Sequence, residues 1–107
     1  MVNADIHHIK SRLEWGQPAF TIIDVRDRST YNQGHIMGAL PIPMEDLVSR
    51  ARASLHNQRD IYVYGKDDLQ AADAVRRLRA VGFANVAEIQ GGMPAWQSIG
   101  GPMEGVS

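Results

Sequence analysis

The stretch IYVYGKDDLQAADAVRRLRAVGFANVAEI, residues 61–89, decides the fold class. Its first residues, 61–64, are β-branched and aromatic, which is typical of a short strand that ends at Gly65. A helix begins near Asp67 or Asp68 and ends before Gly82, and residues 86–89 form a second strand. The apolar side of the helix carries Ala71, Ala74, Val75, Leu78 and Val81. Because two strands joined by a helical crossover pair in parallel with a right-handed connection, the chain is of the α/β class.

The same alternation continues on both sides of this unit. Residues 20–25, FTIIDV, are a short apolar run that suits a strand buried on both faces of a parallel sheet. We expect further elements in chain order: a helix over 3–15 capped by Asn3, a brief helix over 27–32, a loop over 34–38, a strand at 39–40, a helix over 43–55, a turn at 91–92, and a closing helix over 94–99. The tail, residues 100–107, has little to bury. The sequence predicts one domain over residues 1–107, with a central parallel β-sheet flanked by helices on both faces.

The composition excludes several classes of function. Eleven Lys and Arg against twelve Asp and Glu give a formal charge of −1 and a pI near 6.4, without the basic excess that nucleic acid or anionic lipid requires. No apolar run approaches the roughly 18 residues that cross a bilayer, and the first residues do not resemble a secretory signal, so we expect a cytoplasmic protein with no membrane partner. The 4 histidines lack metal-ligand spacing, and we expect no cofactor and no metal. The absence of cysteine excludes disulfides, thiolate metal sites and a cysteine nucleophile.

Several short motifs together follow the order and spacing of one family. They are IDVR at residues 23–26, Tyr31 with GHIMGA at 34–39 and the stretch to Pro43, the strand at 61–64, the alanine-rich helix at 71–81 with Gly82 and Phe83, and GGMPAW at 91–96. Each motif alone is weak, whereas their order and spacing are specific and cover nearly the whole chain. On these residues the chain resembles a rhodanese domain.

The resemblance implies a sulfur chemistry for which this chain lacks the residues. Active rhodaneses carry a cysteine directly after this strand, which takes a sulfane sulfur from a donor such as thiosulfate and passes it to an acceptor. Backbone N–H groups at a helix N-terminus and an arginine later in the loop favour the thiolate. In a gapless alignment the cysteine, the loop glycine and the arginine fall on Gly65, Asp68 and Gln70. The resemblance therefore implies no catalytic residue in a degenerate loop of sulfurtransferase length: Gly65, Lys66, Asp67, Asp68, Leu69 and Gln70. A laboratory Cys→Gly change would explain only the first of the three losses.

Two adjacent aspartates stand at the start of the helix that follows this loop. Either Asp67 or Asp68, as a cap, would accept hydrogen bonds from N–H groups two or three residues on, which typically contributes about 1 kcal/mol. Capping is the simplest interpretation, and a further hypothesis is that the loop carries its own anion and disfavours thiosulfate or phosphate. A general acid/base pair or a hard-metal site stays open, although two aspartates supply few of the oxygen ligands such a metal needs.

Three residues outside the loop are candidates for lining the pocket: Asp24, Arg26 and His35. The segments after Val25 and Tyr64 lie where ligands bind in open parallel sheets. The resemblance implies that Asp24 steadies the loop and that His35 is a buried hydrogen-bonding residue. Arg26 either reaches toward the loop or pairs with a carboxylate. We expect four other residues only to pack: Tyr62, Tyr64, Met93 and Trp96.

Three functions stay open at this stage. The first is a catalytically inactive rhodanese-like domain that binds an unknown protein partner or acts as a regulatory or accessory module. The second is an enzyme of another kind that uses Asp67, Asp68 or Gln70, and the third is residual sulfurtransferase activity.

Overall fold

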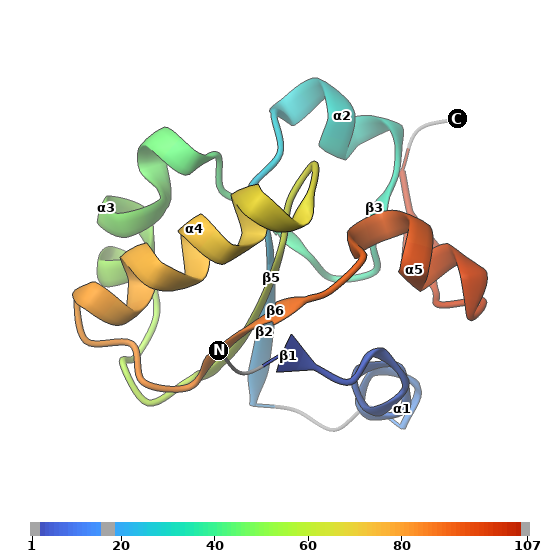
Figure 1. Ribbon diagram of the computed structural model, residues 1–107, viewed down its shortest axis with the longest axis horizontal. Helices are drawn as coiled ribbons and strands as arrows, with labels where there is room; N and C mark the ends of the chain where they lie inside the picture. Colours follow the sequence, from blue (N-terminus) through green and yellow to red (C-terminus); the bar gives the residue numbers. More distant parts are fainter. Residues whose placement is uncertain (1–2, 16–18, 106–107) are drawn as a thin grey trace.

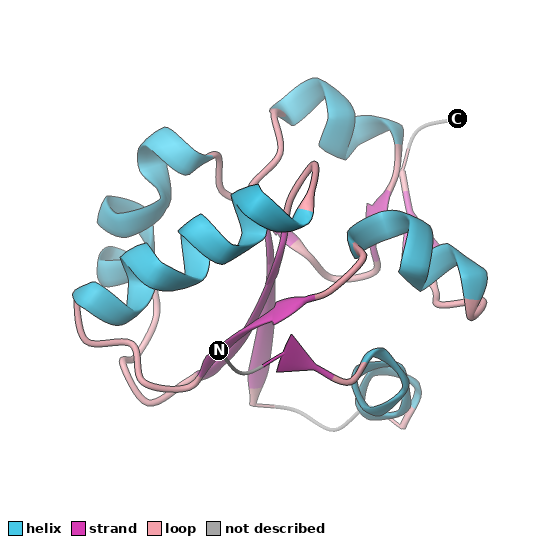
Figure 2. Ribbon diagram, in the orientation of Figure 1, coloured by secondary structure: helices cyan, strands magenta, loops and turns pink. Residues whose placement is uncertain are grey.

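A five-stranded parallel sheet forms the centre of the computed structural model, which describes residues 3–15 and 19–105 (Figures 1 and 2). Every pair of neighbouring strands is parallel, as predicted for residues 61–89 and their surroundings. The strands lie side by side in the order β1 (Asn3–Ala4), β6 (Val86–Ile89), β5 (Asp60–Tyr64), β2 (Phe20–Asp24) and β4 (Leu40–Pro41).

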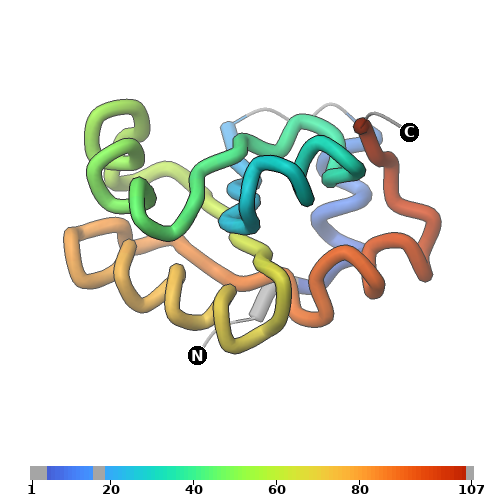
Figure 3. The backbone as a smooth tube through the Cα atoms, turned by 90° about the horizontal axis from the view of Figure 1, so that it is seen from above, coloured from blue at the N-terminus to red at the C-terminus, as the bar shows by residue number. Residues whose placement is uncertain are grey.

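Helices cover both faces of the sheet (Figure 1). On one face lie α3 (Leu47–Ser54) and α4 (Asp68–Ala80), which run side by side in the view from above (Figure 3). On the other face lie α1 (Ile6–Glu14) and α5 (Gly92–Ser98). The short α2 (Arg28–Gln33) follows β2, and the 3-10 turn η1 (Met44–Asp46) leads into α3. The predicted fold class is confirmed.

The two faces have separate apolar cores because successive residues of a strand point to opposite sides. Ile23 of β2 packs with Leu78 of α4 on one side, while Ile22 packs with Ile9 of α1 and Trp96 of α5 on the other. The predicted apolar side of α4 is buried in the first core, with Val81 partly buried beside it. The unbroken apolar run of β2 therefore serves both cores.

The predicted start of the first helix was wrong, because a short strand precedes the helix. Asn3 does not cap the first helix, because Asn3–Ala4 forms β1 and pairs with β6 in the register Asn3↔Glu88. Asp5 is the cap instead, and its carboxylate accepts a hydrogen bond of 2.9 Å from the backbone N–H of His7. The backbone of the first described residues is held by the sheet edge, a long-range pairing that local periodicity does not reveal.

The predicted loop over 34–38 was also wrong, whereas the tail has little to bury, as predicted, since none of residues 100–105 is buried. β3 (His35–Ile36) pairs antiparallel with β7 (Met103–Glu104) in a second, two-stranded sheet. The carbonyl of Pro102 accepts hydrogen bonds from the Met37 N–H at 3.1 Å and from Nε1 of Trp96 at 2.9 Å. The tail is thus fastened to the body of the protein.

Two boundaries differ slightly from the prediction. The short strand β4 lies one residue later, and α5 begins at Gly92 rather than Pro94. Gly91 precedes α5 in the left-handed conformation with φ 82°, which glycine adopts without steric cost. Within residues 3–15 and 19–105, no helix is long and apolar enough to span a bilayer.

Candidate functional site

The loop from Gly65 to Gln70 lies at the carboxyl end of β5, beside the end of β2, where Asp24 pairs with Tyr64. A cavity of about 380 Å³ opens at this edge of the sheet. Arg26, Met44, Lys66 and Gln70 are among the residues that line it. This is the edge at which parallel sheets bind ligands.

The side chain of Gln70 fills the space beside Gly65. A Cβ atom built on Gly65 would lie 2.6 Å from the Oε1 atom of Gln70 and 3.1 Å from its Cβ. Oε1 also accepts a hydrogen bond of 2.9 Å from the backbone N–H of Lys66. The loop's own amide therefore occupies the position into which a side chain at residue 65 would project, and it uses one of the loop's N–H donors.

The two aspartates of the loop have different roles. Asp67 is the N-cap of α4, since its Oδ1 atom accepts a 2.8 Å hydrogen bond from the N–H of Gln70. Asp68 does not cap; its Oδ1 accepts a 2.9 Å hydrogen bond from the N–H of Gly91 in the turn before α5. The carboxylates thus use donors both within the loop and in the neighbouring turn.

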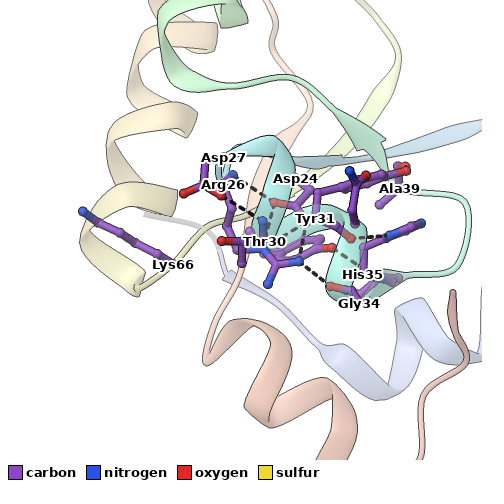
Figure 4. A network of polar contacts seen from close by, with 12 residues as sticks. Asp24, Arg26, Asp27, Thr30, Tyr31, Gly34, His35, Ala39 and Lys66 are labelled. Carbon is purple, nitrogen blue, oxygen red and sulfur yellow. Dashed lines mark hydrogen bonds and ion pairs between the residues drawn. The ribbon is translucent and has the colours of Figure 1, made fainter. Parts of the chain in front are cut away.

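Two residues of the loop point toward solvent. The Leu69 residue is 82% exposed, although it is a large apolar residue. The side chain of Lys66 extends away from the ion pair of Arg26 (Figure 4). Neither side chain takes part in the hydrogen bonds that close the loop, to which Lys66 contributes only its backbone N–H.

Asp24 and Arg26 form a buried ion pair beneath the cavity (Figure 4). The Asp24 carboxylate is fully buried and accepts hydrogen bonds from Nε of Arg26 at 3.0 Å and from Nη2 at 2.6 Å. Nη2 also donates to the carbonyl of Gly34 at 2.7 Å. Burial by itself lowers the pKa of Arg26, but the hydrogen bonds and charge of Asp24 outweigh it and raise the pKa. Of the two sequence-based alternatives, Arg26 adopts the carboxylate pair, while its side chain still lines the cavity.

Tyr64 links this pair to β3. Its hydroxyl accepts a 3.0 Å hydrogen bond from the N–H of Ile36, and the residue is fully buried. Burial, followed by the negative charge of Asp24, raises the pKa of Tyr64, so that the hydroxyl stays protonated. The tyrosine therefore does more than pack, which was all that the sequence predicted.

His35 lies on the far side of α2 from the cavity and does not line it (Figure 4). The residue is 8% exposed, and its ring stacks on that of Tyr31 with centroids 3.7 Å apart. Nδ1 donates to the carbonyl of Tyr31 at 2.8 Å, and Nε2 lies 3.5 Å from Oε1 of Glu104. The histidine thus ties α2 to β7.

A family model described as a Rhodanese-like domain matches residues 5–99. The chain belongs to the rhodanese-like family. It contains no cysteine, so this rhodanese-like domain has no residue that could carry a persulfide.

Known relatives of this rhodanese-like domain are found among both solved structures and curated proteins. The crystal structure of the Alr3790 protein from Anabaena superposes with a TM-score of 0.93, at 63% identity, over 96% of this chain and 92% of that one. The HTH-type transcriptional regulator Rv0324 of Mycobacterium tuberculosis is 40% identical over 86 residues, which are 78% of this chain. The putative thiosulfate sulfurtransferase SseB of the same species is 33% identical over 121 residues, covering 86% of this chain. The rhodanese-like domain spans 37% and 42% of the lengths of these two curated relatives.

Sequence reasoning missed one buried carboxyl group near the loop. Glu88 of β6 is 6% exposed, and its Oε2 atom has no hydrogen-bond partner among the residues that the structure describes. Burial raises the pKa of Glu88, and the charge of Asp68 raises it further. The sequence could have indicated this burial. Glu88 lies two residues after Val86, so both side chains point to the same side of β6, and Val86 belongs to the core.

The acidic residues that the structure describes do not assemble into a metal site. Among residues 3–15 and 19–105, no group of three or more His, Cys, Asp or Glu side chains is placed to hold a metal ion. Asp67 and Asp68 accept hydrogen bonds from backbone groups on different elements, which accounts for both side chains.

Proposed function

We propose that this rhodanese-like domain is catalytically inactive and serves as a protein-binding module with a regulatory or accessory role. One observation carries the proposal: the Gln70 side chain fills the space beside Gly65, with Oε1 only 2.6 Å from the point where a Cβ atom of residue 65 would stand. Residue 65, where the resemblance places the sulfur-carrying cysteine, has no thiol, and the Gln70 side chain occupies the space that a side chain at this position would need.

The chemistry of sulfur transfer supports inactivity. A sulfane sulfur must be held covalently between its donor and its acceptor, and the chain offers no thiolate for this step. Anion binding at the loop is disfavoured as well, since the N–H groups of Lys66 and Gln70 already donate to side-chain oxygens. The cap carboxylate of Asp67 adds negative charge where a substrate anion would approach.

The relatives support an accessory role. One of them is named a transcriptional regulator, and this chain matches 37% of its length, so the matching region is one part of a larger protein. A rhodanese-like domain that has lost its sulfur carrier can retain a folded surface for a partner. As part of this proposal, residues 1–107 act as one domain.

An NMR titration tests whether the loop is closed to anions. Thiosulfate and phosphate are added to the ¹⁵N-labelled protein while the amide signals of residues 65–70 and Gly91 are followed. We expect no saturable shifts at millimolar anion, whereas Gln70→Ala, which frees the Lys66 N–H and the space beside Gly65, gains weak binding. Micromolar binding to the unmodified protein would contradict the proposal.

A second candidate is an enzyme of another kind that uses the 65–70 loop. The observation that favours it is the 380 Å³ cavity, which still carries Lys66, Gln70 and the nearby Glu45 on its walls. The discriminating variants are Asp67→Asn and Asp68→Asn. If the unmodified protein turns over a substrate in a metabolite screen, loss of that turnover in either variant would support this candidate. A change in stability without loss of turnover supports capping.

A further inference from the structure

We propose that residues 102–105 form a redox-sensitive strap, which oxidation of Met103 to its sulfoxide releases from the body of the protein. These residues, which include β7, are called the tail strap below. The inference goes beyond the proposed function and does not rest on it.

Methionine supplies all the sulfur in this chain, which has 5 methionines and no cysteine. An oxidant that attacks sulfur can therefore react only with thioethers, and it reaches the exposed ones first. Among the methionines that the structure describes, Met37 is 41% exposed and Met103 36%, whereas Met93 is 8% exposed and Met44 packs partly against a core. Met1 lies outside the described residues. Met37 and Met103 are thus the accessible thioethers of the described chain.

The side chain of Met103 packs against Gly34, the residue between α2 and β3. A Cβ atom built on Gly34 would lie 3.3 Å from the Cε atom of Met103. The strap approaches the same residue again at Gly105, where an added Cβ atom would lie 2.7 Å from the Cα atom of Gly34. The end of the Met103 side chain therefore takes part in a close contact between the tail strap and the start of β3.

Little apolar burial holds the tail strap in place. No residue of the strap is buried. Its carbonyl at Pro102 accepts hydrogen bonds from the N–H of Met37 and from Nε1 of Trp96, and Oε1 of Glu104 accepts one of 2.9 Å from the N–H of Gly38. Segments with few buried apolar contacts open locally at a small free-energy cost. The loss of one side-chain contact therefore has a large effect on how often the strap detaches.

Oxidation by a peroxide makes the end of the Met103 side chain polar. The thioether sulfur attacks one oxygen of hydrogen peroxide, an S–O bond forms as the O–O bond breaks, and water leaves after a proton moves to the departing oxygen. The sulfur is oxidised by two electrons and the peroxide is reduced by two. The sulfoxide is larger and polar, and its oxygen draws water to the contact with Gly34. The oxidised side chain therefore no longer holds the strap on β3.

Gly34 connects the tail strap with the edge of the cavity. Its carbonyl accepts the 2.7 Å hydrogen bond from Nη2 of Arg26, whose side chain lines the cavity (Figure 4). The neighbouring His35 has its Nε2 atom 3.5 Å from Oε1 of Glu104 in the strap. Release of the strap thus removes contacts from two consecutive residues, one of which positions Arg26. Oxidation at the tail therefore changes the surroundings of the buried ion pair.

Hydrogen exchange measured by NMR on the full chain, before and after treatment with hydrogen peroxide, tests the inference. The N–H groups of Met37 and Gly38 and the indole N–H of Trp96 report on the strap, because each donates to it. We expect their exchange to become about tenfold faster or more once peptide mass mapping shows that Met103 is oxidised. The N–H of Ile42, which donates to the Asp24 carbonyl, should be unchanged. Methionine sulfoxide reductases that act on both sulfoxide epimers should restore slow exchange.

Matched variants make the test specific to one sulfur atom. Met103→Leu keeps an apolar side chain without a thioether, so peroxide should leave its hydrogen exchange unchanged. Met103→Gln has a polar side chain of similar length, and it should exchange quickly without any oxidant. Met37→Leu is the control: it removes the other exposed thioether and should respond to peroxide as the unmodified protein does.

Several results would overturn the inference. They are unchanged exchange of the Met37 and Gly38 N–H groups in protein oxidised at Met103, a response that Met37→Leu abolishes, and slow exchange in Met103→Gln. Oxidation of the buried Met93 before Met103 would also contradict it. Equally accelerated exchange at Ile42 would show that oxidation unfolds the whole protein rather than releasing the strap.

Discussion

At the scale of single residues, the position of the Gln70 side chain depends on the absence of a side chain at residue 65. The Gln70 amide can lie where it does because residue 65 has no side chain. We predict that Gly65→Ala lowers the free energy of unfolding by about 1 kcal/mol, since the new Cβ displaces Oε1 and breaks its hydrogen bond to the Lys66 N–H. Urea denaturation measures the change.

The double variant identifies the cause of that loss. In a Gln70→Ala background the space beside Gly65 is open, so Gly65→Ala should be neutral or stabilise by about 0.5 kcal/mol through the unfolded state. The two substitutions therefore couple by about 1 kcal/mol. Equal effects of Gly65→Ala in both backgrounds would show that Gln70 does not fill the site.

Glu88 is a buried carboxyl group whose ionisation costs stability. Its pKa is raised in the folded protein above the ordinary value of 4.5, so the folded state binds more protons than the unfolded state across that interval. The free energy of unfolding must then fall as the pH rises from about 4.5 toward the raised pKa. We predict that Glu88→Gln removes this fall and is more stable than the unmodified protein at pH 8 by about 1 kcal/mol.

Asp68→Asn tests the contribution of the neighbouring charge. The amide oxygen can still accept the hydrogen bond from Gly91, but the charge that raises the pKa of Glu88 is gone. Unfolding of this variant should therefore depend less steeply on pH. A pH dependence that Glu88→Gln leaves unaltered would assign the effect to other groups.

These residue-scale features were only partly predictable. The sequence places Gln70 and Asp68 at the positions of the missing arginine and glycine, which was enough to predict a degenerate loop. The direction in which the Gln70 side chain folds depends on the loop backbone and on the vacancy at Gly65, and the partner of Asp68 lies in a turn distant along the chain. Neither contact leaves a local pattern.

At the scale of elements, the helix α4 depends on Asp67 at its N-terminus. Its carboxylate caps the helix through a 2.8 Å hydrogen bond from the Gln70 N–H. We predict that Asp67→Ala lowers the free energy of unfolding by about 1 kcal/mol, whereas Asp67→Asn, which is a good cap, loses much less. Thermal and urea unfolding check both values, and an Asn variant as unstable as the Ala variant would argue against capping.

The elements differ in how well they could be predicted, for a physical reason. β5, α4 and β6 have strong periodicity because their burial is regular, and their predicted bounds agree closely with the structure. β1, β3 and β7 are two residues long, and each exists because a partner strand from elsewhere in the chain completes its hydrogen bonds. Two residues carry no periodic signal, so these strands were predicted as helix, loop and tail.

At the scale of the whole molecule, the protein has the rhodanese-like fold, and the Gln70 side chain fills the space beside Gly65 at the start of the loop after β5. The sheet brings the ends of β2 and β5 together, and the buried pair of Asp24 and Arg26 supports that edge from below. Leu69, in the first turn of α4, is exposed beside this loop.

The thiosulfate-to-cyanide sulfur transfer assay tests the central claim most directly. The unmodified protein should give only the background rate, and Gly65→Cys alone should stay far below an enzyme because Gln70 and Asp68 still occupy the loop. Turnover by the unmodified protein at about 1 per second or faster would contradict the account.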